Sequence, residues 1–344
     1  MLRLALIGCG NMGTAHKQRF DRLHHRMRVT ATVDIDRDKA VLAQSLLGAD
    51  LATTDYREAL AQCDAVLIAL PHHLHHPVGM GCIAAGKHVL MEKPLAISEQ
   101  ECLELIHAAD DRHVTLMVAY IQRYHPLIIK MGELIKTKAY GEAFHVSMWT
   151  EQFTRFPEPD SWGHKAATLG GGQLFSHGCH YIDLILDWLG EPIEGTHTGT
   201  NFGTSWMERE GTSDVAVKFA NGAVAYHGAT WGARGTRLGY AFHAICTEGT
   251  LELDQFKGIL YLHRDNDQHS GQSREPQILA HDEGGLKHTD LEMAHFLDCV
   301  ENHQCPLTDG RRSLQSLRVI WRLYEAEQRG VVADLRGLSL RDAG

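Results

Sequence analysis

The stretch Leu2-Arg3-Leu4-Ala5-Leu6-Ile7-Gly8-Cys9-Gly10-Asn11-Met12-Gly13 decides the fold of this 344-residue chain. Its first six residues predict a short apolar strand, and the glycines that follow predict a tight turn into a helix. Gly8 permits the turn, Gly10 lets the backbone approach an anion closely, and Gly13 allows close packing of the helix on the strand. Amides at the start of the helix face the anion. The stretch therefore predicts a dinucleotide site, with Asn11 and Met12 in the same turn.

The residues downstream of this turn alternate between strand patterns and helix patterns. A capping box at Ser98 and Glu101 starts one helix, and Pro77 lies where the first turn of another helix begins. Strands joined by helical crossovers form a parallel, doubly wound sheet of the Rossmann type. We predict such a domain over residues 1–120, with strands at residues 2–7, 28–33, 65–70, 88–91 and 114–119.

An acidic residue at the end of the second predicted strand indicates which dinucleotide is bound. Asp34 takes the position where a carboxylate accepts hydrogen bonds from the adenosine ribose and repels a 2′-phosphate. Arg37, three residues further on, works in the opposite direction, because a guanidinium accommodates a phosphate. We expect NAD as the cofactor in preference to NADP.

After residue 120 the pattern changes to a second domain, which we assign to residues 121–344. A helix at 127–136, a strand at 143–148 and a polar loop at 150–168 precede a helix that opens at the triple glycine 170–172 and runs to residue 189. Asn221-Gly222 and Glu248-Gly249 predict two tight hairpins, with strands at 214–219, 223–229, 242–246 and 250–253. We expect a mostly antiparallel open sheet, an exposed loop at 265–285, and closing helices at 291–302 and 311–329.

Composition excludes several classes of protein. The chain carries 33 basic and 43 acidic residues, a net charge of −10, with no basic face for nucleic acid. A mean hydropathy of −0.23 and the lack of a long apolar run argue against a membrane protein. Eight dispersed cysteines without a C-x-x-C pair favour reduced thiols in the cytoplasm. The neighbouring histidines 72, 73, 75 and 76 match no zinc spacing, so we expect no metal.

Five motifs in order make the chain similar to the Gfo/Idh/MocA oxidoreductases, which include glucose–fructose oxidoreductase and inositol dehydrogenases. They are the glycine-rich turn, Pro71-His72-His73-Leu74-His75, Gly86-Lys87-His88-Val89, Met91-Glu92-Lys93-Pro94, and the triple glycine followed by Gly178-Cys179-His180-Tyr181-Ile182-Asp183. The resemblance covers nearly the whole chain. It implies a substrate domain that commonly forms homodimers or homotetramers through its open sheet, and it leaves the substrate undefined.

The resemblance implies a catalytic lysine and a catalytic histidine. In the family the lysine of Glu-Lys-Pro holds the reacting oxygen, and the match here is Lys93, beside Glu92. The family's Asp-x-Gly-x-His motif matches His180, but Ser176 stands in the acidic position. Two hypotheses follow. Either His180 remains the general base with Ser176 as a weak orienting group, which we favour, or proton transfer shifts toward Lys93 and His177.

Further matches imply contacts to cofactor and substrate. Pro71, His72 and His75 fall in a loop that lies over the cofactor in the family, and the resemblance implies that Glu92 and Lys93 also contact the cofactor. The residues expected to bind substrate together with Lys93, Ser176, His177 and His180 are Arg123, Tyr124, Trp162 and Lys165. Aromatic rings that pack on C–H faces and polar edges that bind hydroxyls suit a polyol.

The sequence therefore predicts an NAD-dependent oxidoreductase that moves a hydride between the nicotinamide and a secondary hydroxyl of a sugar, sugar derivative or cyclitol. One alternative is a redox-neutral enzyme that cleaves or epimerises its substrate through transient oxidation. Another is a non-catalytic NAD-binding sensor, since a fold by itself does not define an activity.

Overall fold

The structure is a computed structural model that describes residues 1–156, 158–237, 239–264 and 275–340. Its chain divides into two compact units. Unit 1 contains residues 1–121 and 288–314, and unit 2 contains residues 122–287 and 315–344. The sequence-based assignment placed residues 288–314 in the second domain, whereas in the compact units this segment returns to the first.

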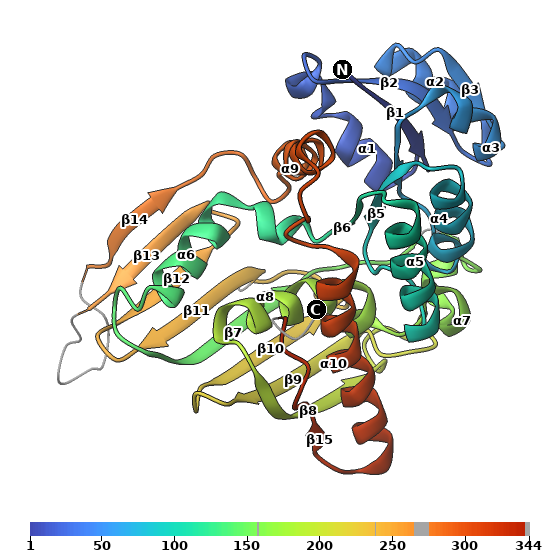
Figure 1. Ribbon diagram of the computed structural model, residues 1–344. Helices are drawn as coiled ribbons and strands as arrows, with labels where there is room; N and C mark the ends of the chain where they lie inside the picture. The colour runs from blue at the N-terminus through green and yellow to red at the C-terminus, as the bar shows by residue number, and fades with distance from the viewer. Residues whose placement is uncertain (157, 238, 265–274, 341–344) are drawn as a thin grey trace. The chain divides into compact units, whose positions relative to one another are not determined.

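Unit 1 is built on a six-stranded sheet with the strand order β3-β2-β1-β4-β5-β6, in which every pair is parallel. Helices lie on both faces of the sheet (Figure 1). This confirms the predicted doubly wound Rossmann arrangement. The elements are β1 (Leu2–Ile7), α1 (Asn11–Lys17), η1 (Phe20–Leu23), β2 (Met27–Val33), α2 (Arg37–Leu47), β3 (Leu51–Thr53), α3 (Tyr56–Ala59), η2 (Leu60–Gln62), β4 (Ala65–Ile68), η3 (His72–Leu74), α4 (His75–Ala84), β5 (His88–Glu92), α5 (Glu99–Arg112), β6 (Leu116–Ala119) and α9 (Thr289–Asn302).

Local sequence signals explain where these helices begin. Ser98 accepts a hydrogen bond at Oγ from the amide of Glu101, so the predicted capping box starts α5. The Glu101 carboxylate reaches back to the amide of Ile97, one residue before the usual position. Asp36 caps α2 by accepting from the amides of Asp38 and Lys39. These side chains satisfy amides that the helices leave without a backbone partner.

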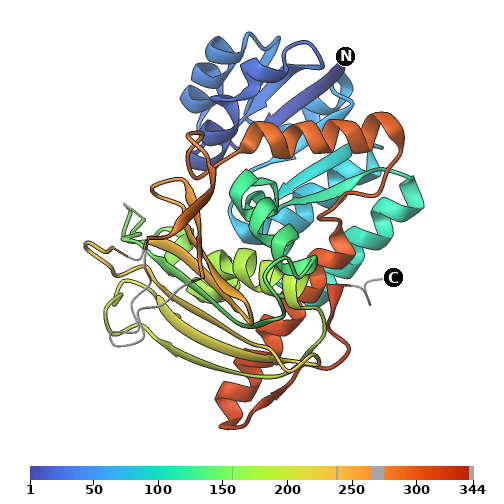
Figure 2. The ribbon, with the colours of Figure 1, turned by 90° about the vertical axis from the view of Figure 1, so that its left-hand side faces the viewer.

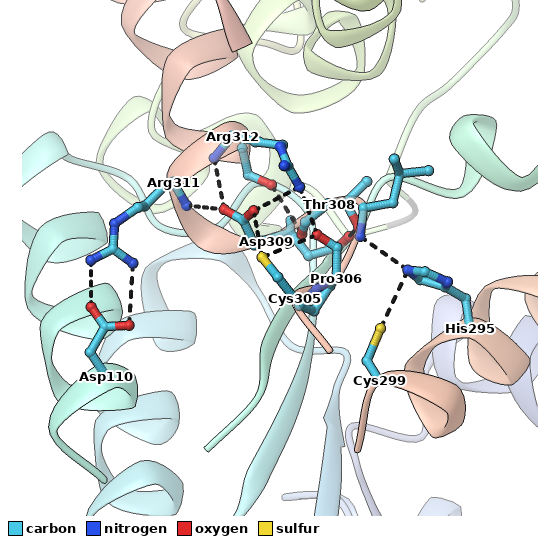
Figure 3. A network of polar contacts seen from close by, with 12 residues as sticks. Asp110, His295, Cys299, Cys305, Pro306, Thr308, Asp309, Arg311 and Arg312 are labelled. Atoms are coloured by element: carbon cyan, nitrogen blue, oxygen red, sulfur yellow. Dashed lines mark hydrogen bonds and ion pairs between the residues drawn. The ribbon is translucent and has the colours of Figure 1, made fainter. Parts of the chain in front are cut away.

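The segment that returns to unit 1 is held by backbone and side-chain hydrogen bonds (Figure 3). The amide of Val118 in β6 donates to the carbonyl of Thr308, and the buried Thr308 hydroxyl donates to the carbonyl of Val118 at 2.7 Å. Arg311 makes a two-pronged pair with Asp110 at the end of α5. The segment is therefore joined to the edge of the parallel sheet, beside β6.

Unit 2 contains a nine-stranded sheet in the order β14-β13-β12-β11-β7-β10-β9-β8-β15. All of its strand pairs are antiparallel except β7 with β10. The strands are β7 (Ala143–Glu151), β8 (Pro192–Thr200), β9 (Thr212–Phe219), β10 (Val224–Thr230), β11 (Tyr240–Cys246), β12 (Gly249–Asp254), β13 (Ile259–His263), β14 (Gln277–His281) and β15 (Ala333–Asp334). The short and helical elements are η4 (Ile121–Tyr124), α6 (Pro126–Lys136), η5 (Trp162–His164), α7 (Ala166–Leu169), η6 (Leu174–Gly178), α8 (Cys179–Leu189) and α10 (Gly310–Arg329), of which α10 starts within unit 1.

This sheet confirms both predicted hairpins and corrects one predicted loop. Strands β9 and β10 pair antiparallel around Asn221-Gly222, with Gly222 at φ +87°, and β11 pairs with β12 around the second turn. The loop expected at 265–285 is wrong in part, because residues 277–281 form β14 against β13. The sequence analysis placed these residues in a loop because polar residues surround the short apolar run Ile278-Leu279-Ala280, and among the described strands β14 pairs with β13 alone. Residues 265–274 of the expected loop lie outside the described residues.

Helices α6, α8 and α10 contact one face of the unit 2 sheet, and no helix of the described part of this unit covers the opposite face (Figure 2). The alternating burial along β9 and β11 reflects this one-sided cover. The side chain of His125 caps α6 by accepting from the amide of Leu127 at Nδ1. Among the described helices, none combines the length and the apolar character needed to span a bilayer.

Substitution of Thr308 by Val tests whether the returning segment is part of the fold of unit 1. The change keeps the shape of the side chain but removes the donor to the Val118 carbonyl, which then stays buried without that hydrogen bond. We expect a loss of about 1–2 kcal/mol in the free energy of unfolding, measured by urea titration. The matched surface change Arg311→Ala should cost under about 1 kcal/mol, because that pair with Asp110 is half exposed. An equal loss in both variants would contradict the assignment.

Candidate functional site

The glycine-rich turn of unit 1 forms a cradle with room for an anion. Gly8 has φ +97°, and a Cβ atom there would clash with the carbonyl of Ala69 at the end of β4. A Cβ on Gly13 would clash with the carbonyl of Gly8, whereas one on Gly10 would meet nothing within 4 Å. Gly8 and Gly13 therefore shape the turn, and Gly10 leaves open space before α1, whose start is not capped by a side chain. This geometry fits a dinucleotide pyrophosphate.

Asp34 ends β2 beside this turn and is held in place by two backbone amides. Its carboxylate accepts from the amide of Cys9 at 2.8 Å and from the amide of Asp36 at 2.9 Å. Each carboxylate oxygen retains capacity for a further donor, such as a ribose hydroxyl. Arg37 is exposed at the start of α2. Ile35, which follows Asp34 directly, is 94% exposed.

The loop after β4 carries Pro71, His72 and His75, which were predicted to contact the cofactor. Pro71 starts the short helix η3, and His72 is buried with its ring 5.7 Å from that of His75. His75 is fully buried, and its nitrogens lie 2.7 Å from the Pro94 carbonyl and 2.9 Å from the Leu70 carbonyl. Burial lowers the pKa of His75, so the ring is neutral and has one proton for these two acceptors. In the structure His75 therefore joins two loops of unit 1.

Lys93 follows the carboxyl end of β5, the edge of a parallel sheet where ligands bind. Its backbone amide donates to Oε2 of Glu92 at 3.2 Å, and the next carbonyl, that of Pro94, lies against His75. Contacts on both sides thus hold the backbone of Lys93, while its side chain is only partly buried. Glu92 itself is buried, and its carboxylate therefore fixes the backbone of Lys93 from within unit 1.

In unit 2, Ser176, His177 and His180 lie where a π-helical turn passes into an α-helix. Sequence analysis predicted one helix from the triple glycine to residue 189, whereas the structure has a π-helix at Leu174–Gly178 and then α8. A π-helix has more residues per turn than the 3.6 of an α-helix, so residues four apart point in more similar directions. Ser176 and His180, both buried, therefore share a face of this helix. A Cβ on Gly178 would collide with Leu174 and crowd His227, so this glycine lets the turn pack closely.

His177 belongs to a chain of hydrogen bonds that sequence analysis did not foresee. Tyr240 donates its hydroxyl proton to Oε1 of Gln152 at 2.8 Å, and burial raises the pKa of Tyr240 to about 12, so the phenol keeps that proton. His177 Nε2 lies 3.2 Å from the Tyr240 oxygen, and Gln173 Nε2 lies 3.3 Å from His177 Nδ1. The chain is consistent when His177 is neutral and donates from Nε2. Both nitrogens of His177 are thus engaged within unit 2.

The glycine-rich segment before the π-helix is held by a buried carboxyl group and a tyrosine. Glu210 accepts from the amide of Leu174 and from the Tyr324 hydroxyl, at 3.3 and 2.5 Å. The same hydroxyl accepts from the amides of Gly172 and Phe175. A Cβ on Gly172 would collide with the Glu210 carboxyl, so the glycine is required there. Burial raises the pKa of Glu210, and the hydrogen bond from Tyr324 opposes that rise.

The remaining residues predicted to bind substrate have different surroundings. Arg123 is buried and pairs with Asp183 and Asp187 of α8, so its guanidinium serves as a link within unit 2. Tyr124 is also buried. Trp162 packs on Phe156 with ring centroids 5.3 Å apart, and Lys165 pairs with Asp160 on the surface. The roles of these residues toward substrate stay predictions.

The Rossmann sheet, the uncapped glycine turn and the acid directly after β2 are together the features of a dinucleotide-binding domain. Comparison with protein families agrees with this class. Residues 2–120 match the model described as an oxidoreductase family with an NAD-binding Rossmann fold, and residues 128–252 match the GFO/IDH/MocA C-terminal domain. The chain belongs to the Gfo/Idh/MocA oxidoreductase family.

Similar proteins include enzymes that differ in their reactions. Levoglucosan dehydrogenase from Pseudarthrobacter phenanthrenivorans is 26% identical, with 73% of each chain covered. The 2,7-anhydro-N-acetylneuraminate hydratase of Escherichia coli is 25% identical over 74% of this chain and 68% of that protein. A solved levoglucosan dehydrogenase in complex with NADH and levoglucosan has the same fold, with a TM-score of 0.86, 21% identity, and coverage of 97% and 99%.

Substitution of Tyr324 by Phe tests how the triple-glycine segment is held. The change removes the acceptor of two amides and the donor to Glu210, so we expect a loss of about 1–3 kcal/mol in the free energy of unfolding. A carboxyl with a raised folded pKa stabilises the fold at low pH and loses this contribution as pH rises. Because the variant raises the pKa of Glu210 further, the loss should be larger at pH 8 than at pH 5.

Urea titrations at the two pH values measure this difference. Tyr261→Phe in β13 is the control, because the structure gives that hydroxyl no hydrogen bond to another described residue. A pH-independent loss in Tyr324→Phe would show that the coupling to Glu210 is absent.

Proposed function

We propose that this protein is an NAD-dependent dehydrogenase or reductase that transfers a hydride between the nicotinamide and a secondary hydroxyl of a sugar, sugar derivative or cyclitol. The observation that carries the proposal is the support of Lys93 at the carboxyl end of β5, where Glu92 holds its amide and His75 faces the next carbonyl. The family membership and a relative named levoglucosan dehydrogenase support the substrate class. Asp34 and its two amide contacts support NAD over NADP.

The protein's own residues have separate roles in this reaction. When bound, NAD supplies the hydride acceptor. We assign His180 to removal of the hydroxyl proton and Lys93 to the developing charge on the substrate oxygen. Ser176 shares the face of His180 and supplies a hydroxyl in place of the family's usual carboxylate. In the reductive direction the same groups act in reverse.

Transient oxidation is the second candidate, because one relative is named a hydratase rather than a dehydrogenase. Such a reaction needs additional proton transfers, for which the buried His180 supplies a group in unit 2 and the neighbouring His177 a second one if it exchanges its contacts to Tyr240 and Gln173 for substrate. The two candidates differ in one observable: a dehydrogenase accumulates NADH, whereas transient oxidation forms product without NADH.

The test is a panel of cyclitols, aldoses and glycosides with NAD or NADP, in which nicotinamide absorbance and product composition are followed together. We expect substrate-dependent NADH with at least one member and a lower rate with NADP. Lys93→Met should lower kcat/KM at least about 100-fold, because it removes the group at the reacting oxygen, and should leave NADH affinity within about threefold.

The surface variant Lys39→Met on α2 is the control for this change and should retain the kinetics of the unchanged protein. Product without NADH would favour transient oxidation. A Lys93→Met variant with unchanged turnover would contradict the proposed mechanism, and a protein that binds NADH but turns over no member of the panel would favour a sensor.

We also propose that the protein forms a homodimer or homotetramer through the uncovered face of the unit 2 sheet. This face carries large side chains that a monomer leaves partly exposed, including Trp149, whose ring is tilted against that of Tyr226 with centroids 4.9 Å apart, and Ile245 of β11. Such a face gains from burial against a second copy. With no disulfide among its eight cysteines, the chain suits the reducing cytoplasm, which we propose as its location.

Replacement of Ile245 by Lys tests the assembly. A charge in the centre of the buried face should dissociate the oligomer, because an unpaired ammonium in an apolar contact is costly. We expect sedimentation to give the 38.3 kDa monomer for this variant and a multiple of that mass for the unchanged protein. Leu46→Lys makes the same chemical change on the exposed side of α2 and should leave the mass unaltered. A monomeric unchanged protein would defeat the proposal.

A further inference from the structure

A buried histidine of α1 contacts the carboxylate that supports Lys93. His16 has no exposed surface, and its Nε2 lies 2.9 Å from Oε1 of Glu92. The other oxygen of Glu92 accepts from the amide of Lys93. One carboxylate therefore joins the helix that follows the glycine-rich turn to the backbone of the lysine.

The ionised form of Glu92 is favoured by its neighbours. Burial raises the pKa of Glu92, but the hydrogen bond from His16 and the positive charge of Lys93 are among the effects that outweigh it and lower the pKa overall. From α9, the buried Glu292 faces the same group, and burial and the charge of Glu92 raise its pKa well above the usual range. Glu92 is therefore the charged carboxylate of this group, and Glu292 is a neutral acid.

The second nitrogen of His16 shows that packing does not account for this residue. His16 Nδ1 is buried and has no hydrogen-bond partner among the described residues. A buried nitrogen without a partner is unfavourable, and an apolar side chain at this position would avoid that cost. The hydrogen bond from Nε2 to Glu92 is the polar contact that offsets the cost of the unpartnered Nδ1.

We propose that His16 is a positioning residue, which acts through Glu92 to hold the backbone and the charge environment of Lys93 in the active arrangement. This inference rests on the proposed function of Lys93. In this proposal α1 both follows the glycine-rich turn that faces the cofactor and, through His16 and Glu92, fixes the position of Lys93. His75 holds the same segment from the opposite side, through the Pro94 carbonyl.

The proposal makes activity depend on the protonation of Glu92. Without the donor from His16, burial should raise the pKa of Glu92, and a protonated Glu92 would cease to balance the charge of Lys93. The acidic limb of the pH profile of kcat/KM should then move to higher pH. His16→Leu removes the donor, whereas His16→Gln places an amide donor close to the position of Nε2 and should restore the limb.

The experiment compares these two variants with a matched control on α9. His295 is a histidine of unit 1 whose Nε2 accepts from the amide of Leu307 at 3.0 Å (Figure 3), and it is not among the groups that bind Glu92 or shift its pKa. His295→Leu should lower thermal stability as His16→Leu does, while its acidic limb stays in place. Thermal unfolding first establishes that every variant is folded, and kcat, KM and NADH affinity are then measured from pH 5 to pH 9.

For His16→Leu we expect the acidic limb to rise by about one pH unit and kcat at pH 7 to fall by about 10- to 100-fold. NADH affinity should stay within about threefold, and His16→Gln should return the limb to within about 0.3 units of the unchanged protein. The proposal would be overturned if the acidic limb of His16→Leu coincided with that of the unchanged protein. It would also be overturned if weaker NADH binding explained the whole loss of activity.

A titration that needs no substrate separates this inference from the proposed function. The carboxyl signal of Glu92, assigned with Glu92→Gln in ¹³C-glutamate-labelled protein, should titrate at higher pH in His16→Leu than in the unchanged protein. Equal titration overturns the coupling even where the enzyme is active. A shifted titration in a protein that oxidises no alcohol supports the coupling and contradicts the proposed function instead.

Discussion

The close contact between the turn after β1 and the end of β4 is the constraint on which unit 1 depends. Gly8 adopts a positive φ, and its α-carbon faces the Ala69 carbonyl at a distance that excludes any side chain. Because Gly13 packs on Gly8 in the same way, strand, turn and helix form one rigid corner at the point where the strand order reverses. The cofactor cradle, the Asp34 contact to the Cys9 amide and the position of α1 all follow from this corner.

Buried charges near the candidate site are each held by several donors or counter-charges. Glu92 has His16 and the Lys93 amide, Arg123 has two aspartates of α8, and Glu210 has Tyr324 and an amide. Burial of such groups is expensive when a partner is removed, so each fixes a local arrangement rather than adding much net stability.

The sequence predicted the elements whose signals are local. Strand β1, the capped helix α5 and the hairpin at Asn221-Gly222 follow from patterns within a few residues, and the structure confirms them. The prediction missed strand β14 because its apolar run, Ile278-Leu279-Ala280, is short and lies within a polar stretch, where only the pairing with β13 defines a strand. The prediction also missed the π-helical turn at Leu174–Gly178. Its cause is not local, because Glu210 and Tyr324, which are distant in sequence, hold the segment where it begins.

The sequence by itself determined the class of protein. The glycine spacing, the acid after the second strand and the Glu92-Lys93-Pro94 motif can each be recognised from the sequence without knowledge of the tertiary contacts. Only the tertiary structure shows which partners the polar side chains of the candidate site meet. Arg123 turned out to be committed to Asp183 and Asp187, His75 to backbone carbonyls, and His16 to Glu92. The physical reason is that a polar side chain's role depends on the partner it meets after burial, and residues 16 and 92 become neighbours only when the parallel sheet and its helices are assembled.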